Sequence, residues 1–125
     1  MLFHFIGPIP ADLRIHGGEL SPCISTAHCA RQDWLSSNPQ SDLQTLIDAV
    51  KETPRTIIVE EDDGYIHAEA SSALFGFVDD LELLAVPATG IIQSRSISRL
   101  GDSDLGVNTA RLDRLKILIN LREQN

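Results

Sequence analysis

Two short runs of strand-forming residues flank the dipeptide Asp63-Gly64, and this arrangement restricts the fold more than any other feature of the chain. The runs are residues 55–61 and 65–71, and Asp-Gly between two such runs is typical of a two-residue type I' hairpin turn. Such a turn fixes which residues lie opposite each other and therefore which side chains share a face. The predicted apolar face consists of Ile57, Val59, Ile66, Ala68 and Ala70, and the predicted polar face of Glu60, His67 and Glu69.

An amphipathic helix is expected before this hairpin. Ser41, followed three residues later by Gln44, has the capping-box pattern, and apolar residues then recur at helical spacing from Leu43 to Val50. Pro54 ends the predicted helix, because the residue before a proline is pushed out of the helical region.

A second hairpin and a second helix are expected after the first hairpin. Residues 78–86 and 91–99 are predicted strands joined by a turn at 87–90, and Asn108 is the predicted N-cap of a helix with Leu112 and Ile119 on its apolar face. This order predicts an α+β fold, in which a four-stranded antiparallel sheet has two helices packed on one face.

Residues 1–40 are predicted to form an irregular arm packed on the body, so that residues 41–125 make the α+β part of a single domain. Four prolines and the pair Gly17-Gly18 interrupt every regular pattern in the arm, with a short helix within 27–35 as an alternative. The arm carries more apolar groups than water would tolerate, namely Leu2, Phe3, Phe5, Ile6, Ile9, Leu13, Ile24, Trp34 and Leu35.

The chain contains 18 acidic and 10 basic residues, and its formal net charge is -8. Such a charge repels phosphate backbones and anionic membrane surfaces, so we expect no nucleic acid as a partner and no membrane insertion. The apolar N-terminal stretch lacks a basic region and is too short to span a bilayer, which favours a cytoplasmic protein. Cys23 and Cys29 are then expected as reduced thiols, and with His28 they still lack the fourth ligand of a zinc site.

Opposite charges face each other on the strands of the second hairpin. Asp79, Asp80 and Glu82 lie on the first strand, and Arg95 and Arg99 lie on the second. Structural ion pairs are the simplest interpretation, and at an exposed site each pair contributes a few tenths of a kcal/mol. In the alternative, one arginine stays unpaired and offers its planar guanidinium to a carboxylate or phosphate ligand.

Polar residues in the loop after these strands favour the alternative in which an arginine binds a ligand. Ser103, Asp104 and Asn108 follow closely and, with Arg95 and Arg99, outline a candidate ligand site at the end of the sheet.

Two groups of residues partly match metal-binding patterns, and neither is predicted to bind a metal. In the loop, Gly106 and Val107 stand where a calcium-binding loop needs a ligand and a glycine. Glu60, His67 and Glu69 are explained more simply as a half-solvated sheet surface than as a metal or proton-transfer cluster. We therefore predict no metal and no cofactor, and the absence of a nucleophile or phosphate-binding motif leaves no predicted catalytic residue.

An ordered series of short blocks runs through the second half of the chain, at residues 65–69, 75–82, 95–99 and 103–108, followed by Arg111. In this order the blocks resemble the signature of the domain of unknown function 1499 family of bacteria, cyanobacteria and plastids, over roughly residues 20 to 121. The resemblance adds Arg111 to the candidate ligand-binding residues and implies no reaction.

The leading functional expectation is a non-enzymatic module that binds a protein partner or self-associates. It rests on the apolar arm and on the last helix, whose apolar face is widened by Ile117 and Leu121. The alternative is a small-molecule or anion-binding protein, with or without catalytic activity, whose site lies around Arg95, Arg99 and the 101–108 loop.

Overall fold

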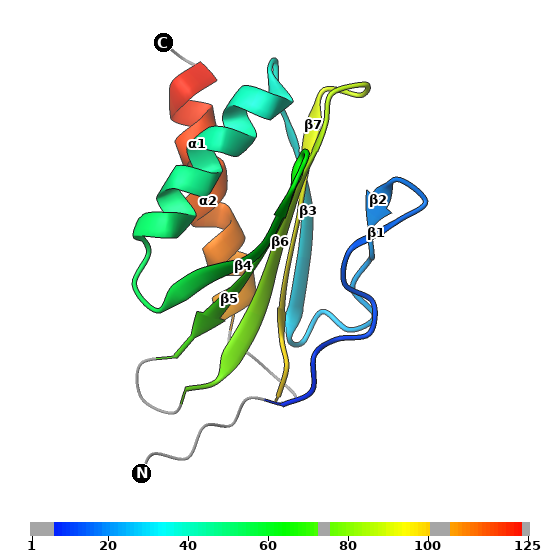
Figure 1. The fold of residues 1–125 in the computed structure, drawn as a ribbon, viewed down its shortest axis with the longest axis vertical. Helices are drawn as coiled ribbons and strands as arrows, with labels where there is room; N and C mark the ends of the chain where they lie inside the picture. The colour runs from blue at the N-terminus through cyan, green and yellow to red at the C-terminus, as the bar shows by residue number, and fades with distance from the viewer. Residues whose placement is uncertain (1–6, 73–75, 101–105, 124–125) are drawn as a thin grey trace.

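The computed structural model describes residues 7–72, 76–100 and 106–123 of the chain. These residues form two helices, a five-stranded sheet and a small two-stranded sheet near the N-terminus. Both helices lie on one side of the large sheet, and the N-terminal segment with the small sheet lies on the other side (Figure 1).

All neighbouring strands of the large sheet are antiparallel. The strands are β3 (Cys29–Leu35), β4 (Thr56–Asp62), β5 (Tyr65–Ser71), β6 (Val78–Val86) and β7 (Ile91–Ser98), arranged in the order β3-β7-β6-β5-β4. The α+β class, both hairpins and the two helices on one face are confirmed. The predicted number of four strands is wrong, because a segment of the arm adds a fifth.

That fifth strand, β3, was expected to be irregular chain or a short helix. It pairs with β7 along its whole length, from Cys29 opposite Ile97 to Leu35 opposite Ile91. Its alternation is weak, because only Ala30 and Trp34 contribute apolar side chains to the main core. The partner strand lies about sixty residues further along the chain, and such a distant pairing leaves no local signal.

The β4–β5 hairpin is present with two corrections. Gly64 adopts a positive φ of 77°, but among the described residues only Arg14 and Arg55 are non-glycine residues with positive φ, so the turn is not type I'. The register then shifts between Ile58 and Glu60, which leaves Val59 as the extra residue of a β-bulge. The bulge changes the face that the earlier residues of β4 occupy.

As a result, the predicted apolar face is wrong for β4. Ile57 and Val59 are 68% and 48% exposed, and Ile58 packs against the core instead. The β5 half of that face is right, since Ile66, Ala68 and Ala70 are buried.

The helices are α1 (Pro39–Glu52) and α2 (Val107–Glu123). Asn38 rather than Ser41 caps α1, because the Asn38 side chain accepts from the Ser41 backbone N–H and Pro39 suits the first turn. The helix ends before Pro54, as expected. Asn108 is not the N-cap of α2, since the helix begins at Val107 and the Asn108 side chain is buried against the sheet.

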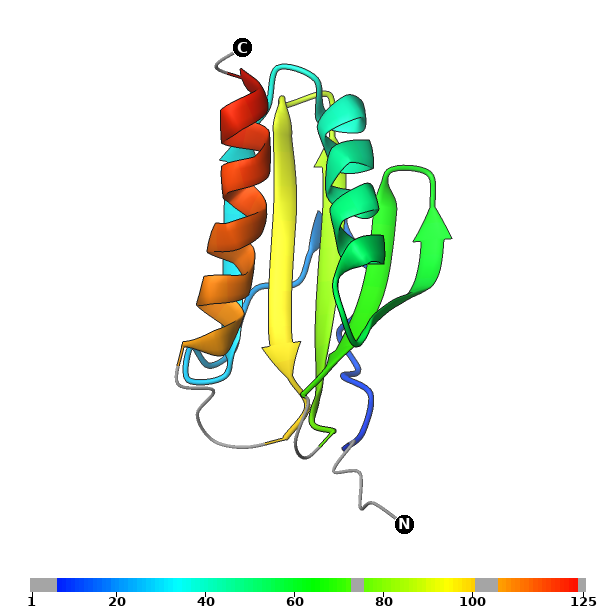
Figure 2. The same cartoon turned by 90° about the vertical axis from the view of Figure 1, so that its left-hand side faces the viewer.

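The main core lies between the helices and the sheet. The two helices run side by side across this face, as Figure 2 shows. The helices contribute Leu43, Leu46, Ile47, Val50, Leu112, Leu115 and Ile119 to it, and the sheet contributes Ala30, Trp34, Ile66, Ala68, Leu81, Leu83, Ala85 and Ile92. On α2, Ile117 and Leu118 remain 53% and 37% exposed, so part of its apolar face is open to solvent.

The part of the arm that precedes β3 crosses the opposite face of the sheet. It contains β1 (Ile15–His16) and β2 (Glu19–Leu20), which pair with each other. Leu20 is buried with Tyr65 and Leu84 in a second, smaller core, whereas Ile9 and Ile24 are exposed. Packing of the arm on the body is therefore present, although several of its apolar residues face solvent and Leu2 to Ile6 lie outside the described residues.

Within the described part of the chain, no helix has the length and apolar character needed to cross a bilayer.

Candidate functional site

The pleat of β6 and β7 distributes the candidate residues over two faces of the sheet. Asp80 and Glu82 point away from the helices, as does Arg95, which lies opposite Glu82 on β7. Asp79, opposite Ser98, points toward the helices. The candidates that are close in sequence therefore form two separate groups.

Arg99 is held by carboxylates on the face away from the helices. Its Nε donates to Asp80 Oδ2 at 2.7 Å, and its Nη2 donates to Asp80 Oδ1 at 2.9 Å and to Glu69 Oε2 at 2.7 Å. His67 Nε2 lies 2.6 Å from the same Asp80 Oδ1. Burial alone would raise the pKa of Asp80, but the hydrogen bonds from Arg99 and His67 lower this pKa below its ordinary value.

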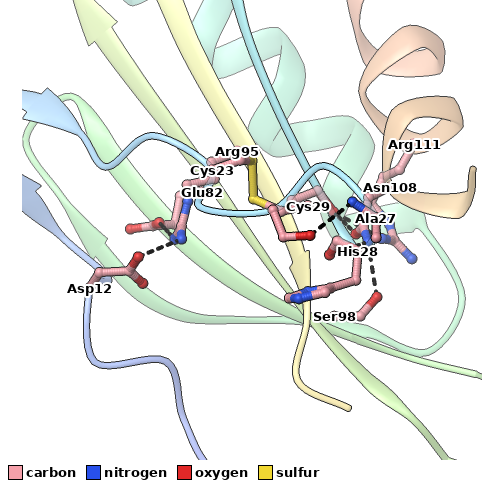
Figure 3. Close-up of a disulfide and its surroundings, with 12 residues drawn as sticks. Asp12, Cys23, Ala27, His28, Cys29, Glu82, Arg95, Ser98, Asn108 and Arg111 are labelled. Carbon is pink, nitrogen blue, oxygen red and sulfur yellow. Dashed lines mark hydrogen bonds and ion pairs between the residues drawn. A yellow bond between two sulfur atoms is a disulfide. The ribbon is translucent and has the colours of Figure 1, made fainter. Parts of the chain in front are cut away.

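Arg95 forms a second buried network beneath the arm. Its side chain is 1% exposed and binds Glu82 Oε1 at 3.3 Å and Asp12 Oδ2 at 2.7 Å (Figure 3). The other oxygen of Glu82 accepts from the Tyr65 hydroxyl at 2.6 Å and from the Arg14 backbone N–H at 2.7 Å. Burial, followed by the hydrogen bond to Glu82, raises the pKa of Tyr65, so the phenol stays protonated.

A disulfide between Cys23 and Cys29 fastens the end of the arm to β3 (Figure 3). The prediction of reduced thiols is therefore wrong. The strand places Cys29 on the face that the arm crosses, and the two Cα atoms lie 5.7 Å apart, within the range that a disulfide bridges. Disulfides persist mainly in oxidising compartments, and this bond therefore gives no support to the cytoplasmic location expected from the sequence. That location stays a prediction.

These contacts make Asp80 and Glu82 partners of Arg99 and Arg95 in buried ion pairs. The energy assigned to exposed pairs does not apply, because the side chains of Asp80, Glu82 and Arg95 are all at most 1% exposed. A ligand-binding role for the two arginines stays a prediction. Carboxylates accept from Nε and Nη2 of Arg99 and from Nη1 and Nη2 of Arg95, whereas the buried Nε of Arg95 has no partner among the described residues.

A cluster of possible metal ligands overlaps the first network. His67, Glu69 and Asp80 each offer one ligand atom, and these atoms lie within 4.8 Å of one another. Arg99 donates to both carboxylates, so its guanidinium already supplies the positive charge that a cation would bring. Glu60, which was predicted to share one sheet face with His67 and Glu69, forms an ion pair with Arg14.

On the helix side, Asn108 connects the start of α2 to the sheet. Its Nδ2 donates to the His28 carbonyl oxygen at 3.1 Å and to Ser98 Oγ at 2.9 Å, and its Oδ1 accepts from Ser96 Oγ at 2.5 Å. Asn108 is fully buried, so its contacts are structural.

Arg111 lies one turn further along α2 and faces the same sheet residues. It forms an ion pair with Asp79 Oδ2 at 2.9 Å and donates to Ser96 Oγ at 3.0 Å. The predicted residues Asn108 and Arg111 thus lie together, separated by the sheet from Arg95 and Arg99. Ser103 and Asp104 lie outside the described residues.

A cavity of about 480 Å³ opens beside Arg111, where α1 ends and α2 begins. This volume lies within the range of ligand pockets, about 300 to 1,000 Å³. The polar part of its lining includes the hydroxyl residues Thr53, Thr56, Ser71, Ser72 and Ser98, and the apolar part includes Phe77, Leu100 and Val107.

Two arginines outside the predicted site also line this cavity. Arg55 lies at the entrance to β4, and Arg114 lies on α2 three residues after Arg111. Both are exposed, and neither side chain has a hydrogen-bond or ion-pair partner among the described residues. The Arg111 and Arg114 spacing was a usable signal, because residues three apart are neighbours on a helix. Nothing in the sequence placed Arg55 near them.

The backbone conformation of Arg55 supports a role for its side chain in the cavity. Its φ of 55° lies in the left-handed region, where a residue with a Cβ carries a cost of about 1 to 2 kcal/mol and glycine does not. The Ser71 backbone N–H donates to the Arg55 carbonyl oxygen at 2.8 Å and helps to hold this conformation. The chain thus accepts a strained backbone at a position where the arginine side chain faces the cavity.

A family model described as "Protein of unknown function (DUF1499)" matches residues 19–118 of this chain. The match covers most of the chain, so the protein belongs to this family, as the ordered blocks of the sequence indicated. No curated protein and no solved structure matches the chain.

Proposed function

We propose that this member of the DUF1499 family binds a small anionic molecule in the cavity between the end of α1 and the start of α2. The observation that carries the proposal is the presence of Arg55 and Arg114 in the cavity without a carboxylate partner among the described residues. The proposal assigns binding to the cavity and no reaction.

The charges that line the cavity contrast with the charge of the whole chain. Among the described residues that line the cavity, Arg55, Arg111 and Arg114 stand against the one carboxylate of Asp79, three positive groups to one negative. The chain as a whole has a formal net charge of -8. A planar guanidinium offers paired donors that match a carboxylate or a phosphate, so both are suitable ligand groups.

Of the three arginines, Arg111 is the one with polar partners among the described residues. Its ion pair with Asp79 and its hydrogen bonds to Ser96 and Asn108 hold the side chain between helix and sheet. We therefore assign to Arg111 the shaping of the cavity wall, and to Arg55 and Arg114 the direct contact with the anion.

Isothermal titration of the whole protein with inorganic phosphate and with short carboxylates tests the proposal. A charged hydrogen bond contributes about 1.5 to 3 kcal/mol, so Arg114→Ala and Arg55→Ala should each weaken binding by about 10-fold to 100-fold. Lys116→Ala and Lys51→Ala are the matched controls, because they remove exposed cations near the same helix regions without lining the cavity. If the control variants lost as much affinity as the arginine variants, overall charge would explain the binding and the proposal would be rejected. Failure of every anion to bind would also reject the proposal.

Protein binding or self-association is the second candidate, and one observation favours it. Ile57 and Val59 are exposed on β4, which is an edge strand of the sheet. Edge strands that expose apolar side chains can pair with another chain, although the bulge at Val59 opposes such pairing. Sedimentation analysis over a range of concentrations tests this candidate: association that Ile57→Lys abolishes would support it, and a monomer at every concentration would reject self-association.

A further inference from the structure

A second cavity of about 280 Å³ lies next to the anion-binding cavity, between α1 and α2. Its apolar lining comes from Ala49 and Val50 of α1, Leu81 of β6, and Leu115 and Leu118 of α2. Val50, Leu81 and Leu115 are buried, whereas Leu118 is 37% exposed.

The two cavities adjoin each other. Thr53, Thr56, Arg111 and Arg114 line both of them. On α2 the lining runs from Val107, in the first cavity, to Leu118, in the second. At a rise of about 1.5 Å per residue, these positions extend over roughly 16 Å of the helix.

We propose that the ligand is an anionic amphiphile, with its anionic group at Arg55 and Arg114 and a linear apolar chain along the second cavity. This inference rests on the anion binding proposed above and adds the apolar part of the ligand. An anion without an apolar chain would leave Leu118 and the groove beside it in water, whereas a chain seated there would bury apolar surface on both sides.

The arginines themselves suit the junction between the two parts. An arginine side chain carries an apolar stem and a charged end, and such side chains commonly lay the stem along apolar surface. At the boundary, the stems of Arg111 and Arg114 can continue the apolar wall while their guanidinium groups face the polar cavity.

A chain-length series of monomeric probes tests the inference in titrations of the whole protein below micelle-forming concentrations. Hexanoate, octanoate and decanoate should bind with affinity that rises about fourfold for each added methylene, the value for burying a CH₂ group. Decyl phosphate should also bind, whereas decanol, which lacks the anionic group, should bind at least 10-fold more weakly than decanoate.

Two matched variants locate the apolar chain. Leu118→Gln should weaken decanoate binding by about 10-fold and leave the affinity for acetate unchanged. Ile117→Gln is its control, because Ile117 is the neighbouring exposed residue on α2 and does not line either cavity. Arg114→Ala should weaken acetate and decanoate by the same factor.

The outcomes separate this inference from the proposal on which it rests. Anion binding that requires Arg114 but shows no dependence on chain length would overturn the amphiphile and leave the anion site standing. Equal affinity for decanol and decanoate would overturn both. Binding only to vesicles of anionic phosphatidylglycerol, with no uptake of monomeric probes, would also overturn the inference, since it would show a surface interaction rather than a seated chain.

Discussion

Removal of Arg99 should destabilise the protein far more than removal of an ordinary surface arginine. The Arg99 side chain is 3% exposed and donates to Asp80, which is fully buried, and to Glu69. Arg99→Ala removes the main counter-charge of the Asp80 carboxylate and leaves His67 as its partner among the described residues. Breaking a buried pair in this way costs about 3 to 5 kcal/mol.

This loss is a large part of the free energy of unfolding, which is about 5 to 15 kcal/mol for a typical domain. Asp80→Ala should cost about 3 kcal/mol, because Arg99 then keeps only Glu69, whose side chain is 34% exposed. The double variant should lose little more than either single variant, since the second substitution removes a group that the first left unpaired. The expected coupling energy is therefore about 3 kcal/mol.

Urea denaturation gives the measurement, with the fluorescence of the single tryptophan, Trp34, as the signal. Arg31→Ala is the control, because Arg31 pairs with Asp33 on the same face and that aspartate is 52% exposed. The control should lose less than about 1 kcal/mol. If Arg99→Ala fails to fold, Arg99→Lys can replace it, because lysine keeps the charge and loses the paired geometry. Its loss in the free energy of unfolding should lie between those expected for Arg31→Ala and Arg99→Ala. Additive losses in the double variant would refute the buried pair.

Three other predictions concern pH, the disulfide and Arg55. The lowered pKa of Asp80 contributes stability that is fully present above pH 3.8, its ordinary pKa, and is lost as the pH falls below that value. The raised pKa of Tyr65 contributes stability that is fully present below pH 10.0, its ordinary pKa, and is lost as the pH rises above that value. Urea midpoints across the pH range should therefore drop at both ends, and the alkaline drop should shrink in Tyr65→Phe. Reduction of Cys23–Cys29 should lower the unfolding free energy by about 2 kcal/mol, and dithiothreitol should have no such effect on Cys29→Ser. Arg55→Gly should raise the unfolding free energy by about 1 kcal/mol by relieving the left-handed backbone while it weakens phosphate binding; a loss of stability would contradict the strain argument.

Local patterns in the sequence predicted the elements that depend on neighbouring residues. Both hairpins, the end of α1 before Pro54 and the apolar stripe from Leu43 to Val50 follow from turn residues and periodicity, and all are present. The elements that failed depend on distant contacts. Strand β3 pairs with a strand far along the chain, and the bulge at Val59 moved Ile57 off the core face without any glycine to mark it.

The candidate site shows the same limit. The opposite charges on the two strands indicated that acidic groups would contact Arg95 and Arg99. They could not show that these groups are buried, because the arm, which covers this face and includes Asp12, is distant in sequence. Nor could it separate Asp79 from Asp80, adjacent in sequence and on opposite faces. Arg55 reaches the cavity only because α1 ends beside the start of β4, which is a property of the tertiary fold.

The arginines on the two faces of the sheet differ in whether they have carboxylate partners, and this difference indicates where a ligand binds. On the face under the arm, every described arginine is paired: Arg14 with Glu60, Arg31 with Asp33, Arg95 with Glu82 and Asp12, and Arg99 with Asp80 and Glu69. Carboxylates outnumber basic groups throughout this chain, so partners for two more arginines were available in its composition. At the cavity between α1 and α2, only Arg111 has such a partner among the described residues. Among the described residues that line this cavity, three arginines share the one carboxylate of Asp79. Like charges repel one another, and an anionic ligand at Arg55 and Arg114 would offset that repulsion.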